Sequence, residues 1–174
     1  MSAVDPWLEI AGTIQDELEK IEDIGVVVAG HIYVQEWADF LETYTSTIDG
    51  ASVIRGWQIV EPQVGDGYQT ELQTLGSTMQ LEDTLSFFIR GFTEMGDDKD
   101  ASQADFRNLA WEAKRKLDAL VRFTLSDTGL SVPRSYPAAG LRVVPMVFHN
   151  VECWGCDMTK RVRIQRTETA TGSV

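Results

Sequence analysis

The sequence is poor in the residue types that most often build catalytic and metal sites. Its 174 residues include two histidines and two cysteines, and two cysteines cannot form the disulfide framework of a small secreted protein. The chain has no glycine-rich phosphate-binding loop, no nucleophile elbow and no His-Glu-x-x-His pattern. We therefore expect a protein that is not an enzyme and that needs no cofactor.

Long hydrophobic runs are also missing. No stretch approaches the roughly 18 consecutive apolar residues that a membrane-spanning helix needs, so we expect no membrane partner. Residues 1–6 carry no positive charge and precede no long apolar segment, so we expect no secretory signal and synthesis in the cytoplasm. Hydrophobic residues still make up 43% of the chain, which is enough for the core of one domain.

Basic residues are scarce in the first part of the chain. Residues 1–100 contain 4 Lys or Arg against 20 Asp or Glu, whereas residues 101–174 contain 11 against 7. The formal net charge of −12 argues against a surface that grips nucleic acid through its phosphates. The uneven distribution has two interpretations: a chance spread over a solvated surface, or an acidic and a basic side that stack head to tail in neighbouring copies.

Two segments have the periodicity of amphipathic helices. The first begins at Asp5, a favourable N-cap, and Pro6, and it extends toward Gly25. The second begins near Ser102, with an acidic residue three positions later as in a capping box. A shorter helix is predicted at residues 35–44. The apolar stripes of the two long helices consist of Trp7, Leu8, Ile10, Ala11, Ile14, Leu18 and Ile21, and of Phe106, Leu109, Ala110, Ala113, Leu117, Leu120 and Val121.

Alternating and β-branched segments predict strands before and after the second long helix. These segments are residues 26–29, 51–60, 77–94, 141–148, 151–158 and 161–165. The pattern predicts an α+β fold, with a mainly antiparallel sheet and two long amphipathic helices packed on one face. We expect a single domain over residues 1–166, with a long loop or arm near 61–80, a loop at 127–140 and a flexible C-terminal tail at 167–174.

One cluster of metal-ligating residue types consists of His149, Cys153 and Cys156. Two thiols separated by two residues can bind zinc or perform redox chemistry. A closed zinc site needs four ligands, and His31 is the one remaining histidine. A redox pair usually opens a helix, whereas this pair lies in a β-rich segment. We favour two half-buried thiols around a turn or bulge at Trp154, and a small zinc or thiol domain is the alternative.

Tryptophans and arginines suggest where a partner could bind. Trp111 lies off the apolar stripe of its helix, so it belongs either to a wider stripe or to an interface. Trp7, Trp37 and Trp57 lie on core-facing patterns. Arg161 and Arg163 share one face of a predicted strand, where they would contact an acidic neighbouring subunit or lie on a solvated edge.

The order of several short motifs along the chain is similar to that of a known family. A long N-terminal helix is followed by the sequence IRGWQI at 54–59, a β segment at 85–92 and the sequence DASQADF at 100–106, which opens the second long helix. Cys156 then precedes the sequence RVRIQ at 161–165. In this element order the chain resembles the tail terminator and tail completion (neck) proteins of tailed bacteriophages.

The resemblance implies a structural virion protein, made in the host cytoplasm, that forms a homo-oligomeric ring, commonly a hexamer. The ring would cap the tail tube at its head-proximal end and join it to the head–tail connector proteins. Its partners would be copies of itself, the tail tube protein and the connector, with DNA passing through the lumen without sequence-specific binding. An acidic lumen would let that DNA slide. Another head–tail joining or neck component is the alternative.

The family has no catalytic residues to carry over, and its contacts are made by loops and arms. The resemblance therefore implies an oligomer or tail interface in the segments 61–80 and 127–140 and on the basic strand that follows. The candidate interface residues are Gln73, Leu75, Met79, Arg134, Tyr136, Arg161 and Arg163.

Overall fold

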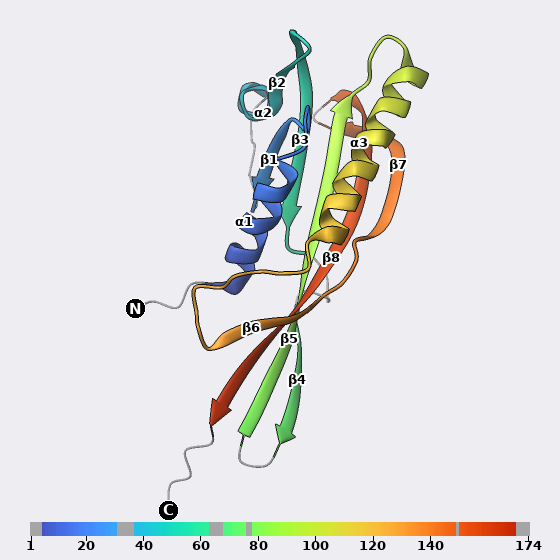
Figure 1. Cartoon of the computed structure of the whole chain (residues 1–174). Helices are drawn as coiled ribbons and strands as arrows, with labels where there is room; N and C mark the ends of the chain where they lie inside the picture. The colour runs from blue at the N-terminus through green and yellow to red at the C-terminus, as the bar shows by residue number, and fades with distance from the viewer. Residues whose placement is uncertain (1–4, 31–36, 63–67, 76–77, 149, 170–174) are drawn as a thin grey trace, which may run out of the picture.

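The computed structural model describes residues 5–30, 37–62, 68–75, 78–148 and 150–169; for Trp37, 68–75, 78–80 and 167–169 it describes the backbone alone. In this part of the chain three helices and eight strands follow one another (Figure 1). Their order is α1 (Pro6–Leu18), β1 (Val26–Ala29), α2 (Trp37–Tyr44), β2 (Thr45–Ile48), β3 (Ala51–Val60), β4 (Tyr68–Leu75), β5 (Thr78–Glu94), α3 (Lys99–Ala119), β6 (Leu130–Ser135), β7 (Ala139–Phe148) and β8 (Val151–Thr169).

All eight strands belong to one mixed sheet. The main strand order is β1-β3-β5-β8-β6, with β2 also beside β3, β4 beside β5, and β7 beside β8. β1 runs parallel to β3, and the other pairs are antiparallel. The centre of the sheet is the ladder between β5 and β8, which are 17 and 19 residues long. It extends from the pair Thr78–Thr169 to the pair Glu94–Cys153.

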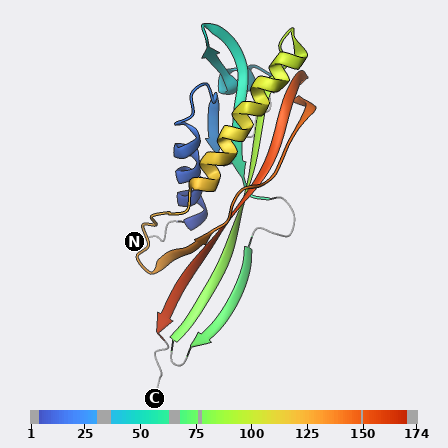
Figure 2. The same cartoon turned by 45° about the vertical axis from the view of Figure 1, so that its right-hand side comes forward.

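One half of this ladder projects beyond the helices (Figure 1). β4 pairs with the first half of β5, from Tyr68–Leu85 to Leu75–Thr78. We call this extension, formed by residues 68–75, 78–85 and 162–169, the arm, and β6 pairs with its base at residues 162–166. Both views show it leading away from α1, α2 and α3 (Figure 2). The central strands therefore serve two parts of the molecule, a helix-covered body and the arm.

α1 and α3 lie side by side on one face of the sheet (Figure 2). Trp57 is fully buried there, and its Nε1–H donates to the Ile24 carbonyl at 3.0 Å. Gly91, paired with Trp57 on the next strand, has no side chain because a Cβ would overlap the indole ring. Phe106 of α3 lies against the same tryptophan, with ring centroids 6.1 Å apart. The indole thus joins α3, the sheet and the turn after α1.

α2 packs on the opposite face of the sheet. Phe92 points away from α1 and α3, and its ring centroid lies 5.1 Å from Tyr44 of α2 and 4.4 Å from Phe148. Gly56, paired with Phe92, leaves room for the Tyr44 ring, which a Cβ at this position would overlap. Phe40, Tyr44 and Phe92 are all fully buried. The sheet therefore has a helix layer on both faces.

The predicted fold class is wrong. The chain is mostly sheet, the sheet is mixed because of β1, and α2 covers the face that we expected to be open. α1 is also short: it ends at Leu18, before Asp23 and Gly25 adopt positive φ values of 56° and 83°. Ile21 continues the apolar stripe in the sequence, but it is buried from a turn and not from a helix.

Three local predictions also differ from the structure. The predicted loop at 127–140 contains β6, which pairs with β8 with a register shift between Ser131 and Arg134. α3 begins earlier than expected, because the N-cap is Asp98, whose Oδ1 accepts from the Asp100 and Ala101 amides at 3.1 and 3.0 Å. β8 is one strand, where two were expected, and it ends at Thr169 inside the segment predicted as a tail.

Candidate assembly interface

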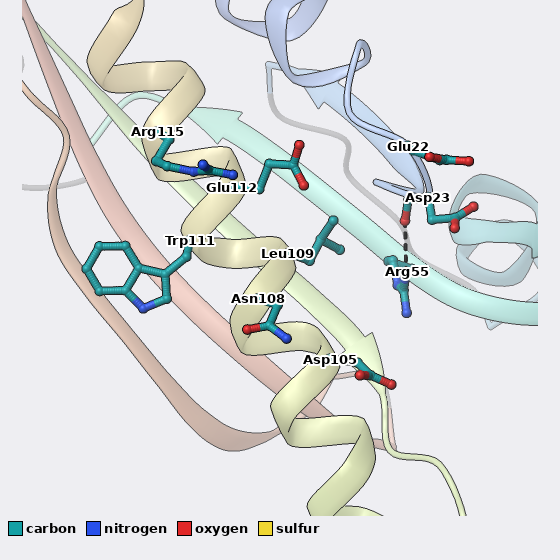
Figure 3. A pocket seen from close by; sticks show the side chains of 9 residues that line it. All are labelled: Glu22, Asp23, Arg55, Asp105, Asn108, Leu109, Trp111, Glu112 and Arg115. Atoms are coloured by element: carbon teal, nitrogen blue, oxygen red, sulfur yellow. Dashed lines mark hydrogen bonds between the residues drawn. The ribbon is translucent and has the colours of Figure 1, made fainter.

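A groove of about 500 Å³ lies between α3 and the turn that follows α1 (Figure 3). Its walls come from the exposed side of α3, the turn and β3. The lining residues are Glu22, Asp23, Arg55, Asp105, Asn108, Leu109, Trp111, Glu112 and Arg115. Four of these carry a carboxylate and two carry a guanidinium group. We call this hollow the acidic groove.

Arg55 is held in the groove by its own chain. Its Nη1 donates to the Asp23 carbonyl at 2.9 Å, the contact drawn in Figure 3, and its Nε donates to Thr93 Oγ1 at 3.2 Å. Burial lowers the pKa of Arg55, and the nearby carboxylates, Asp23 first, oppose that effect. Gly25, at a φ of 83°, makes room because a Cβ there would overlap the Arg55 side chain. Among the described residues Arg55 forms no direct ion pair with the groove carboxylates, although Asp23 and Asp105 lie near enough to raise its pKa.

Trp111 lies on the rim of the acidic groove and is 53% exposed. In Figure 3 its ring projects from α3 on the side away from Arg55. The prediction that Trp111 lies off the apolar stripe is confirmed, and Trp7 and Trp57 are buried at 4% and 0% exposure as predicted. The side chain of Trp37 lies outside the described residues. An indole left in water at this level is typical of a surface that is covered by a partner.

Three of the candidate interface residues form a stack on the opposite face of the sheet. The Cζ atoms of Arg134 and Arg161 lie 4.8 and 5.6 Å from the centroid of the Tyr136 ring. Both arginines are exposed. The amide of Tyr136 donates to the Arg161 carbonyl at 2.9 Å, which fixes the connection after β6 against β8. We call Arg134, Tyr136 and Arg161 the arginine stripe.

The remaining candidate interface residues do not join the stripe. Arg163 lies beside it but is paired within the chain, its Nη1 lying 3.0 Å from Glu82 Oε2. The backbones of Gln73 and Leu75 lie in β4 and that of Met79 in β5, all in the arm. Their side chains lie outside the described residues.

The two cysteines lie on opposite faces of β8. Cys153 packs in the α2 cluster with Phe92, and Cys156 packs under α1 and α3. Burial raises the pKa of Cys153 to about 11 and that of Cys156 to about 12, so both thiols stay protonated at neutral pH. Residues three apart in a strand point to opposite sides, so one ion cannot bind both sulfurs while β8 is intact. No turn or bulge occurs here, and His149 lies outside the described residues.

Lys160 is a charged residue on the core-facing side of β8. It is fully buried, and its Nζ donates to the carbonyls of Leu117 and Leu120 at the end of α3, at 2.7 and 3.1 Å. Burial lowers the pKa of Lys160 to about 8, although Asp118 opposes this. The alternation of β8 carries the signal that we missed, because Lys160 shares its face with Met158, which is also buried.

The described side chains contain no group of three or more His, Cys, Asp or Glu placed to bind a metal ion. Within the same residues, no helix has the length and apolar character to cross a membrane. No protein-family model and no curated protein matches the chain.

Proposed function

We propose that the protein is a structural subunit that assembles with copies of itself into a ring, and that the ring is the tail terminator of a tailed bacteriophage. The observation that carries this proposal is the arm. β5 and β8 continue well past the helices, and β4 widens the extension to three strands (Figure 1). Leu85, Val162 and Ile164 at the base of the arm belong to the core, and the part of the arm beyond them extends away from the helices, where it can reach a neighbour.

The unpaired edge of the arm supports the same role. Among the described residues β4 pairs with β5 and with no other strand, and its sequence YQTELQTL contains no Pro, Lys or Arg and one charged residue, Glu71. Natural proteins usually protect exposed edges with such residues. β6 and β7 on the other edge follow that rule, with Pro133 and Pro145 and a register shift in each. The β4 edge is thus suited to pairing with another subunit.

The place of the ring in a virion rests on the order of the sequence elements, and self-assembly rests on the arm, the acidic groove and the arginine stripe. In this role the protein would act through surfaces and not through catalysis. Its further partners would be the tail tube on one side and the connector on the other. A net charge of −12 suits a lumen through which DNA passes without binding.

Native mass spectrometry over a range of protein concentrations, followed by electron microscopy of the assembled fraction, tests the proposal. We expect one closed oligomer with a central opening, unaffected by a zinc chelator. A monomer at every concentration contradicts self-assembly, and an open filament contradicts the terminator role. Incubation with purified tail tubes separates the two neck roles, because a terminator binds tube ends whereas another joining protein binds the connector alone.

A further inference from the structure

We propose that the arginine stripe of one copy binds the acidic groove of the next copy. This inference rests on the proposed ring and names the two surfaces that hold its subunits together. It differs from the contact expected at the edge of the arm, because it uses charged side chains and not the backbone of β4.

The first argument is placement, because the two surfaces lie on opposite faces of the sheet. Lys160 points toward α3, since its Nζ bonds to the last carbonyls of that helix. Arg161, the next residue in the strand, therefore points away from α3. The acidic groove lies on the α3 side, between that helix and Asp23 (Figure 3). One molecule cannot bring its own stripe to its own groove, so the contact joins two copies head to tail and can repeat around a ring.

The second argument is that both surfaces carry charge that the described residues leave unpaired. Within the described part, Arg134 and Arg161 have no carboxylate within ion-pair distance, whereas Arg163 beside them is neutralised by Glu82. In the acidic groove, Asp105 and Glu112 likewise have no ion pair with a described residue. Contact between the two surfaces would bring these two arginines of one copy against these two carboxylates of the next.

The third argument is that the stripe is already organised for binding. The Tyr136 ring lies against both guanidinium groups, which limits the rotation of Arg134 and Arg161. Guanidinium groups held in place lose less entropy when they form bidentate bonds to carboxylates. Tyr, Trp and Arg are also the residues that contribute most to protein interfaces. Trp111 on the rim of the groove is 53% exposed, so a copy that binds there could also cover its indole.

Two charge-reversed proteins test the contact. The stripe variant is Arg134→Glu with Arg161→Glu, and the groove variant is Asp105→Lys with Glu112→Lys. Each should raise the protein concentration needed for half-assembly by about 100-fold or more, because two attractive pairs become repulsive. Mixed in equal amounts, the two variants should assemble within about tenfold of the wild-type concentration, as rings of alternating composition that native mass spectrometry resolves by mass.

The control variant is Lys99→Glu with Arg122→Glu, which makes the same charge change as the stripe variant at exposed positions outside both surfaces. It should assemble like the wild type. Circular dichroism should give all variants the wild-type spectrum, since every substituted side chain is at least partly exposed. Rescue by mixing also excludes misfolding as the cause of lost assembly.

Each other outcome is decisive. If the wild type assembles and both variants assemble equally well, the inference is wrong and the proposed function stands. If the wild type never assembles, the proposed function fails and the inference fails with it. If the stripe variant assembles normally but loses binding to a single-stranded DNA oligonucleotide, the stripe contacts nucleic acid and the inference is overturned.

Discussion

The two faces of the β5–β8 ladder differ in what covers them, although the same two strands supply both. On the face under α1 and α3, the side chains of Leu85, Phe87 and Ile89 are fully buried. On the other face, Phe88 and Arg90 are partly exposed. The α2 cluster covers that face only around Phe92, Tyr44 and Cys153, and the arginine stripe lies beyond it.

The comparison teaches that the ladder side chains under α1 and α3 belong to the core, whereas those beside the arginine stripe are reached by solvent. The tryptophan N–H groups on the covered face are satisfied within the chain: Trp7 Nε1–H donates to the Ser86 carbonyl at 3.3 Å and Trp154 Nε1–H to Ser102 Oγ at 3.0 Å. Charged groups on the other face lie in reach of solvent and of a partner. Substitutions of ladder residues on the two faces should therefore differ in how much they lower the free energy of unfolding.

The largest effect should come from neighbouring phenylalanines that point to opposite faces. Phe87 is fully buried and stacks on Trp7, with centroids 5.3 Å apart, whereas Phe88 is partly exposed beneath the Arg90 guanidinium. We expect Phe87→Ala to lower the free energy of unfolding by about 3–5 kcal/mol and Phe88→Ala by about 1 kcal/mol. Urea denaturation measures both. Equal losses would show that the two faces do not differ as described.

A smaller effect, visible through pH, should come from the buried amine on the covered face. The pKa of Lys160 is about 8 in the folded chain against 10.5 for an ordinary lysine. Between these values the unfolded chain binds the extra proton, so folding stability rises with pH across this window. Between pH 7 and pH 10 the free energy of unfolding of the wild type should therefore rise by a few kcal/mol more than that of Lys160→Met.

The comparison with Lys160→Met cancels the titration of the two cysteines and of every other shared group. A constant difference between the two proteins from pH 7 to pH 10 would mean that Lys160 is solvated in the folded chain. In that case the pKa of Lys160 in the folded chain would be that of an ordinary lysine.

The smallest effect should come from the ion pair on the other face. Arg90 Nε lies 2.8 Å from Asp157 Oδ1, but these side chains are 36% and 49% exposed. Solvent screens such pairs, so Arg90→Met and Asp157→Asn should each change the free energy of unfolding by about 1 kcal/mol or less. The change should shrink in high salt. A loss similar to that of Phe87→Ala would mean that this face contributes to the core.

Much of the local structure could be predicted from the sequence because burial follows the period of each element. The alternation around Phe87 predicts a strand, as the structure confirms, whereas the pattern around Trp111 left two interpretations open and the structure shows this side chain 53% exposed. Alternation also places Arg161 and Arg163 on one face. These predictions depend on neighbours within a single element, which is the information that one sequence carries.

The arrangement in space could not be predicted in the same way. An amphipathic stripe shows that α2 has a buried side, but it does not show which face of the sheet that side covers. The predicted fold class put all helices on one face, and the position of α2 on the other face made it wrong. Trp154–Gly155 suggests a turn, yet the glycine sits inside β8 because Met146 of the next strand approaches it. The stack of Arg134 on Tyr136 and Arg161 depends on the pairing of β6 with β8, which no local pattern indicates.

The β5–β8 ladder has a consequence for how the chain folds. Its paired residues are far apart in the sequence, as in Thr78 with Thr169, so each contact closes a long loop before it contributes stability. Chains dominated by such contacts fold slowly. β8 also follows α3, β6 and β7 in the sequence, so β5 must remain without its main partner until the last strand arrives. We expect the rate of β5–β8 pairing to limit folding, with β5 as the segment most exposed to aggregation during synthesis.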